Sequence, residues 1–284
     1  MPTLEITTMI GYPVMCTFCP QDTLRKGMES QAKYLSLENF ELILKKIPKH
    51  VRIDFSGMSE PWANKDCTEM VALALKNGYN IAIYTTLFGI DAQGADDLIN
   101  LLKEHSKQVN ELVIHLQDKN ENMKGLKLNQ NWIEVANKFI EFFKLDIISQ
   151  FKFMTMDESG QLHKILSPLQ PIVSEFNGHD IAGSLNVAQV AGQKVTIIDN
   201  NNGMIKCSYT DYYDHNVLLP NGDVLIRCMD YGKKHVFGNL INDAYYDLFQ
   251  SKEYGKLVSA NMNPHRPDTD VSICRKCERA CHAR

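Results

Sequence analysis

Two cysteines near the N-terminus have the residue type and the spacing that most clearly predict chemistry. Cys16 and Cys19 are separated by two residues and follow a β-type run at residues 4–10. Thiolates are soft ligands, so a Cys-x2-Cys pair on a loop after a strand is a candidate clip for zinc or an iron–sulfur centre. The alternative is a redox pair like that of thioredoxin, although that motif usually opens a helix in a shorter fold.

A second group of cysteines lies in the last third of the chain. Five of the eight cysteines follow residue 200, namely Cys207, Cys228, Cys274, Cys277 and Cys281. A disulfide framework fits poorly, because the chain has 284 residues, Cys-x2-Cys pairs near both ends and no recognisable secretion signal. Four thiolates also form a structural zinc site, so zinc is the alternative to an iron–sulfur centre here.

Charge and composition exclude several classes of partner. Lys and Arg number 30 against 34 Asp and Glu, which gives a net charge of −4, and apolar residues make up 44% of the chain. No block of like charge predicts a nucleic-acid or membrane surface. No apolar run approaches the ~20 residues needed to span a bilayer. We therefore expect a cytoplasmic protein with one large core or two modest ones.

Predicted strands and helices alternate along the chain and must position these cysteines. After the first strand, the predicted strands cover residues 51–55, 80–85, 111–115 and 151–154, with a sixth at 171–176 or 195–199. Helices with apolar residues at three- and four-residue spacing are predicted over 37–47, 68–76, 95–105 and 132–143. Such alternation predicts a parallel sheet, with the functional site at the carboxyl ends of its strands.

The length of the region with alternating strands and helices, about the first 200 residues, decides the predicted fold class. A complete eightfold barrel usually takes ~250 residues, more than the first 200 provide. We predict an α/β fold with an open partial (β/α)6 TIM-like barrel over 1–203 and a small C-terminal α+β iron–sulfur domain over 204–284. In the second region, Asn221-Gly222 between two apolar runs predicts a hairpin, and a helix is predicted over 243–259.

The N-terminal loop resembles the cluster loop of the radical SAM enzymes, whose pattern is Cys-x3-Cys-x2-Cys with an aromatic residue before the last cysteine. Cys16, Phe18 and Cys19 fit that pattern, but Tyr12 stands where the first cysteine belongs. The resemblance implies a 4Fe–4S cluster that binds S-adenosylmethionine, with Phe18 near the adenine.

A loop after the second predicted strand is similar to the Gly-Gly-Glu motif of the same family. It reads Phe55-Ser56-Gly57-Met58-Ser59-Glu60-Pro61. The resemblance implies that Gly57, Ser59 and Glu60 bind the methionine end of S-adenosylmethionine. From the residues alone, Glu60 fits equally well in an ordinary loop, in the first turn of the next helix.

The C-terminal third resembles the SPASM and Twitch extensions of radical SAM enzymes, which carry auxiliary 4Fe–4S clusters. The fuller SPASM pattern has seven cysteines, and only five are present here. The resemblance therefore implies one auxiliary cluster. Its favoured ligands are Cys207, Cys228, Cys274 and Cys277, with Cys281 spare or in place of one of these.

The function implied is that of a radical SAM enzyme that abstracts a hydrogen atom from a small polar substrate or a peptide and oxidises it. A flavodoxin or ferredoxin would supply electrons. The sequence does not identify a catalytic acid or base. Tyr12 leaves open an impaired enzyme, a non-enzymatic iron–sulfur relative on the same fold, or an unusual third ligand. A zinc-stabilised barrel protein is the remaining alternative.

Overall fold

The computed structural model describes residues 1–17, 19–29, 31–155, 160–174, 203–263, 272–277 and 280–282. Phe18, the predicted adenine contact, lies outside the described residues. So does the second candidate for the sixth strand, residues 195–199.

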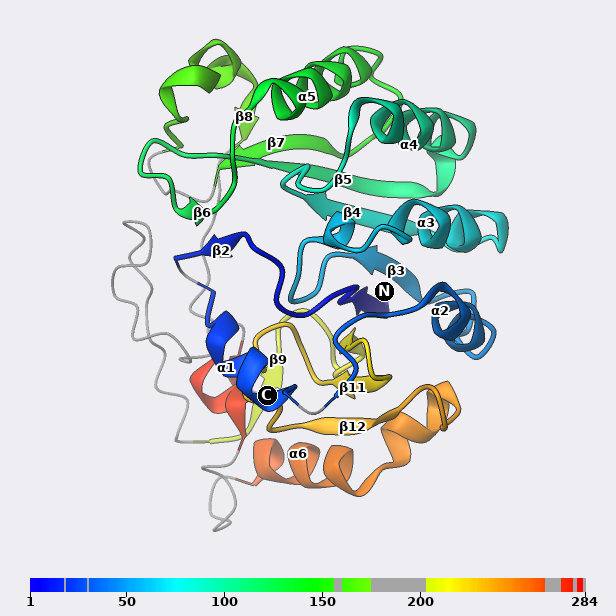
Figure 1. The fold of residues 1–284 in the computed structure, drawn as a ribbon. Helices are drawn as coiled ribbons and strands as arrows, with labels where there is room; N and C mark the ends of the chain where they lie inside the picture. The colour runs from blue at the N-terminus through cyan, green and yellow to red at the C-terminus, as the bar shows by residue number, and fades with distance from the viewer. Residues whose placement is uncertain are drawn as a thin grey trace.

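Six parallel strands form most of the central sheet, and they lie side by side in chain order (Figure 1). They are β1 (Thr3–Ile6), β3 (Arg52–Phe55), β4 (Ile81–Thr85), β5 (Val109–Leu116), β7 (Phe151–Thr155) and β8 (Val173–Ser174). Among the described residues, the two edge strands of the sheet, β12 and β8, do not pair with each other, so the sheet is open, as predicted for a partial barrel. The sixth strand is the first of the two predicted candidates.

Helices connect these strands and lie along one side of the sheet in Figure 1. They are α2 (Leu37–Leu44), α3 (Cys67–Lys76), α4 (Ala92–Glu104) and α5 (Gln130–Phe143). Helices α4 and α5 begin two to three residues earlier than predicted, because Asp91 and Asn129 cap them. Asp91 accepts from Gly94 N at 2.7 Å, and Asn129 accepts from Trp132 N at 2.9 Å.

The C-terminal third extends the same sheet. Strand β10 (His215–Leu218) runs parallel to β1, and β11 (Asp223–Leu225) and β12 (Val236–Asn239) follow it antiparallel. The predicted hairpin at Asn221-Gly222 is confirmed, with Gly222 at φ +90°. The predicted division at residue 203 stays a prediction.

Shorter elements complete the C-terminal part. Strand β9 (Ile205–Cys207) pairs with β13 (Ala280–His282). The predicted helix over 243–259 is a 3-10 helix at Tyr245–Gln250 followed by α6 (Lys252–Met262), because Ser251 caps a new helix by accepting from Tyr254 N at 3.2 Å. Within the described part of the chain, no helix has the length and apolar character needed to cross a membrane.

Candidate functional site

The loop that carries the N-terminal cysteines is held over the carboxyl ends of the barrel strands. Strand β2 (Met15–Cys16) pairs antiparallel with β6 (Met123–Lys124). Gly125 makes this approach possible, because a Cβ there would lie 2.5 Å from Pro13 O. Helix α1 (Gln21–Gly27) then follows Cys19.

A cavity of about 140 Å³ lies beneath this loop and gathers nearly all of the predicted N-terminal site residues. The predicted residues among its lining are Cys16, Cys19, Gly57, Ser59 and Glu60, and Tyr12 lines it as well. Loops that follow β1 and β3 therefore meet at one place, as expected for the carboxyl edge of a parallel sheet.

Tyr12 lines the cavity together with the two cysteines and is only 7% exposed. Burial raises its pKa well above the ordinary value, and the nearby Cys16 and Cys19 raise it further. The phenol is therefore protonated at neutral pH, and a neutral phenol is a poor ligand for a soft cluster. Two thiols and a phenol do not match the donor set of a cluster held by three thiolates.

Tyr231 approaches the same cysteines from the C-terminal third of the chain. It is 5% exposed, lines the cavity and hydrogen-bonds Cys19. The hydrogen bond from Cys16 lowers the pKa of Cys19, with Tyr231 adding to this effect against burial. Sequence reasoning missed Tyr231, for which the only signal was its place three residues after Cys228.

The loop of residues 56–60, called the Gly57 loop below, packs closely against the end of β1. Gly57 has φ +66°, and a Cβ on it would lie 2.5 Å from Thr7 Oγ1. Met58 N donates to Thr7 Oγ1 at 3.1 Å, and Gln21 Nε2 donates to Met58 O at 2.7 Å. Glycine is therefore required here for close backbone approach.

Glu60 is 3% exposed, and its carboxylate accepts four hydrogen bonds. Thr85 Oγ1 and Trp62 N donate to Oε1 at 2.6 and 3.4 Å. The backbone and hydroxyl of Thr86 both donate to Oε2 at 2.7 Å. Burial raises the pKa of Glu60 against these hydrogen bonds. Glu60 thus ties the loop after β3 to the loop after β4.

Ser59 lies next to Glu60 but, unlike Glu60, has a side chain without a hydrogen-bond partner in the described part of the chain. Its hydroxyl is buried and has no hydrogen-bond partner among the described residues. Because it lines the cavity, it is a polar group available to a ligand.

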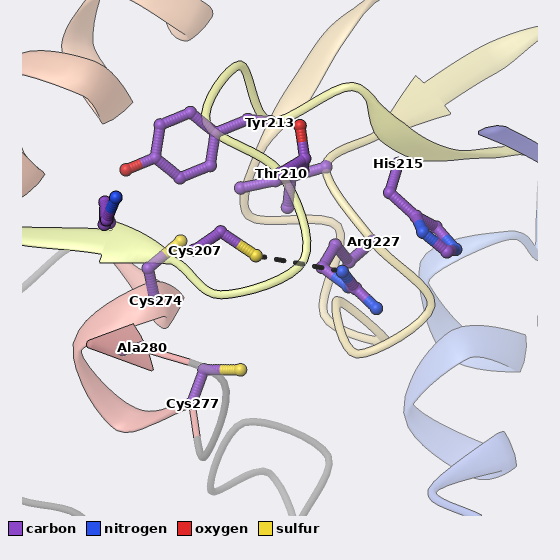
Figure 2. A pocket seen from close by; sticks show the side chains of 10 residues that line it. Cys207, Thr210, Tyr213, His215, Arg227, Cys274, Cys277 and Ala280 are labelled. Atoms are coloured by element: carbon purple, nitrogen blue, oxygen red, sulfur yellow. Dashed lines mark hydrogen bonds between the residues drawn. The ribbon is translucent and has the colours of Figure 1, made fainter. Parts of the chain in front are cut away.

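Three of the five C-terminal cysteines line a second, smaller cavity of about 20 Å³ (Figure 2). They are Cys207, Cys274 and Cys277, and Arg227 lies with them. Arg227 Nη1 is 3.9 Å from Cys207 Sγ. Burial raises the pKa of Cys274 to about 12, although hydrogen bonds with Asn261 and Ser272 oppose this. Three thiols beside a guanidinium fit the donor set and the charge of an iron–sulfur centre.

The other two C-terminal cysteines do not line this cavity. The Cys228 thiol hydrogen-bonds Glu5, and burial together with the Glu5 charge raises its pKa. Cys281 Sγ lies 3.7 Å from Lys206 O. Among the residues that the structure describes, no three Cys, His, Asp or Glu side chains are already arranged to hold a metal ion. The ligands of the C-terminal cluster therefore all stay a prediction.

Comparisons with known proteins agree with these observations. Residues 207–278 match the SPASM family, described as an iron-sulfur cluster-binding domain. The fold is similar to that of BtrN in complex with AdoMet and 2-DOIA, at 14% identity and a TM-score of 0.62 over 98% of this chain and 93% of that chain. It is also similar to anSMEcpe with bound AdoMet, at 15% identity and a TM-score of 0.54 over 98% and 85%. No curated protein sequence matches this chain.

Proposed function

We propose that this chain is a radical SAM oxidoreductase that binds S-adenosylmethionine and oxidises a small polar compound or a peptide. The match of residues 207–278 to the SPASM family and the similarity of the fold to that of BtrN support this proposal. The observation that carries the proposal is the single cavity shared by Cys16, Cys19 and the Gly57–Glu60 loop. BtrN and anSMEcpe, which have this fold, bind AdoMet together with 2-DOIA and with a peptide, respectively.

In this proposal, different residues of the cavity bind different parts of S-adenosylmethionine. The Ser59 hydroxyl and the backbone of the Gly57 loop hold the amino and carboxylate groups, because Ser59 Oγ is buried without a partner. Glu60 positions that loop, because its four acceptor positions are filled by protein donors. Phe18 remains the predicted contact of the adenine.

The proposed auxiliary 4Fe–4S cluster lies with Cys207, Cys274 and Cys277 in the C-terminal cavity. Cys228 is the favoured fourth ligand, with Cys281 as the alternative. Such a cluster, when bound, supplies one-electron oxidation of the substrate and passes the electron on. Arg227 offsets the negative charge of the thiolates. A flavodoxin or ferredoxin is the proposed electron partner.

A second candidate function is favoured by Tyr12. With a neutral phenol beside Cys16 and Cys19, the N-terminal site offers only two thiols. The chain would then be an iron–sulfur protein on the radical SAM fold with little or no catalytic activity.

Iron content and S-adenosylmethionine cleavage test the two candidates. Parent, Tyr12→Cys and Tyr12→Phe proteins are reconstituted anaerobically with iron and sulfide, then reduced with dithionite. If the leading proposal holds, the parent and Tyr12→Cys should both form 5′-deoxyadenosine, and Tyr12→Cys, which completes the three-cysteine set, should form it fastest. If the second candidate holds, the parent and Tyr12→Phe should hold about four irons and form none, and Tyr12→Cys should hold about eight.

The outcomes separate the proposals. Extra iron in Tyr12→Cys without deoxyadenosine supports the non-catalytic candidate. Absence of S-adenosylmethionine binding by all three proteins, measured by calorimetry, contradicts the leading proposal. Colourless protein that holds zinc after reconstitution with iron supports the zinc alternative.

A further inference from the structure

We infer that Cys16 and Cys19 form a dithiol–disulfide redox couple that exchanges with small-molecule disulfides. This activity does not rest on the proposed function. It follows from the mismatch between the N-terminal donor set and a cluster that needs three thiolates. Where the third thiol is missing, the remaining two are available to each other.

The backbone already holds the two cysteines at a distance that a disulfide can bridge. Cys19 N donates to Cys16 O at 3.0 Å, which closes a four-residue turn. Such a turn keeps its first and last Cα atoms within about 7 Å, and disulfides join Cα atoms about 4.4–6.8 Å apart. The two side chains also hydrogen-bond each other through sulfur. Closing the bond therefore requires rotation of side chains and little movement of the backbone.

The surroundings of the pair allow exchange with a small reagent. Both cysteines are partly exposed, and both line the cavity of about 140 Å³. No other cysteine is among the described residues that line it. The Tyr231 hydroxyl hydrogen-bonds Cys19.

The exchange balances with oxidised glutathione as the oxidant. One cysteine thiolate attacks a glutathione sulfur, forming a mixed disulfide and releasing one reduced glutathione. The second cysteine thiolate then displaces the other glutathione and forms the Cys16–Cys19 bond. Two electrons and two protons pass from the protein to glutathione. The oxidised pair has no thiolate left for a metal, so oxidation and metal binding at this site exclude each other.

The chain contains its own matched control. Cys274 and Cys277 have the same spacing, and Cys277 N donates to Cys274 O at 3.1 Å in the same kind of turn. However, Cys274 is engaged by Asn261 and Ser272, and Cys277 is 8% exposed. We expect this pair to exchange more slowly with glutathione than the N-terminal pair.

The test uses the full chain after removal of iron with a chelator under anaerobic, reducing conditions. The protein is equilibrated in buffers of varied glutathione ratio, quenched with acid and labelled with a maleimide. Mass spectrometry then measures each cysteine-containing peptide. We expect Cys16 and Cys19 to lose their labels together, with a peptide lighter by two hydrogens. The loss should follow the ratio of oxidised glutathione to the square of reduced glutathione, as a two-electron exchange requires.

Two variants keep the result interpretable. Cys16→Ser should leave Cys19 as a free thiol or a glutathione adduct. Lys45→Ala, which changes only an exposed ion pair with Glu41, should behave as the parent. Independent loss of the two labels, or stable glutathione adducts on the parent pair, would overturn the inference. Full labelling under oxidising conditions would overturn it as well. Because the assay contains no S-adenosylmethionine and no cluster, its failure leaves the proposed function unaffected.

Discussion

His215 Nε2 lies 2.9 Å from Glu5 Oε1, which joins the first residue of β10 to the middle of β1. Glu5 is 7% exposed, and Ser56 Oγ donates to its other oxygen at 3.4 Å. The Cys228 thiol hydrogen-bonds the same carboxylate. One buried acid therefore connects the barrel, the Gly57 loop region and a predicted cluster ligand.

The contact between Glu5 and His215 predicts that the free energy of unfolding depends on pH. Burial tends to raise the pKa of Glu5, but the hydrogen bond and charge of His215 bring it below the ordinary value. The ionised carboxylate therefore stabilises the fold above the unfolded-state pKa, and this contribution is lost as the pH falls through the folded-state pKa. We expect His215→Ala to lower the free energy of unfolding by about 1–3 kcal/mol at pH 7 and by less near pH 4.

Urea unfolding at the two pH values measures this difference. The control is Lys45→Ala, which breaks an exposed pair with Glu41 and should cost at most about 1 kcal/mol. An equal loss for His215→Ala at both pH values would mean that packing of the ring, and not the charge of Glu5, explains the effect.

Gly57→Ala should destabilise the protein and disturb the cavity. The new Cβ would lie 2.5 Å from Thr7 Oγ1, and the residue would keep a positive φ. We therefore expect the free energy of unfolding to fall by more than about 2 kcal/mol. Gly78→Ala is the matched control, because it has φ +81° but open space around it, and should cost about 1–2 kcal/mol. Unfolding by urea compares the two, and equal losses would show that contact with Thr7 is unimportant.

Glu60→Gln should weaken S-adenosylmethionine binding and lower the melting temperature together. The amide NH2 would face donors such as Thr86 N, so at least one hydrogen bond becomes a donor–donor contact, at a cost of about 1–3 kcal/mol. Calorimetry and thermal melting measure both effects, with the exposed Glu69→Gln as control. Weaker binding without a change in melting would instead indicate direct contact between Glu60 and the ligand.

Replacing Cys274 and Cys277 together by Ala should remove about four irons per chain and lower the melting temperature, because cluster binding is linked to folding. Cys281→Ala is the comparison, since Cys281 lies outside the lining of the C-terminal cavity. Iron analysis should show full retention in that variant. Loss of iron from Cys281→Ala would assign the fourth ligand to Cys281 in place of Cys228.

Tyr12→Cys should also change stability in the iron-free protein. Tyr12 is 7% exposed, so the smaller side chain leaves a cavity that costs about 2–5 kcal/mol. Tyr12→Phe keeps the ring and should cost less. Reconstitution with iron should recover part of the loss in Tyr12→Cys only, which melting curves with and without iron can measure.

Local patterns determined much of this protein. The apolar runs of β3 and β4, the Asn221-Gly222 turn and the spacing of Cys16 and Cys19 each depend on a few neighbouring residues. Period, turn chemistry and ligand spacing can be interpreted over such short distances. These patterns were enough to predict the open barrel, and the resemblance of the cysteine motifs supplied the SPASM-type extension.

Only the tertiary structure decided how distant residues meet. Tyr231 reaches Cys19, His215 reaches Glu5, and Thr85 and Thr86 fill the acceptor positions of Glu60. These contacts depend on the pairing of β10 with β1 and on the register between neighbouring strands. A shift of one residue in a strand turns every side chain to the other face, so no local pattern can specify such contacts.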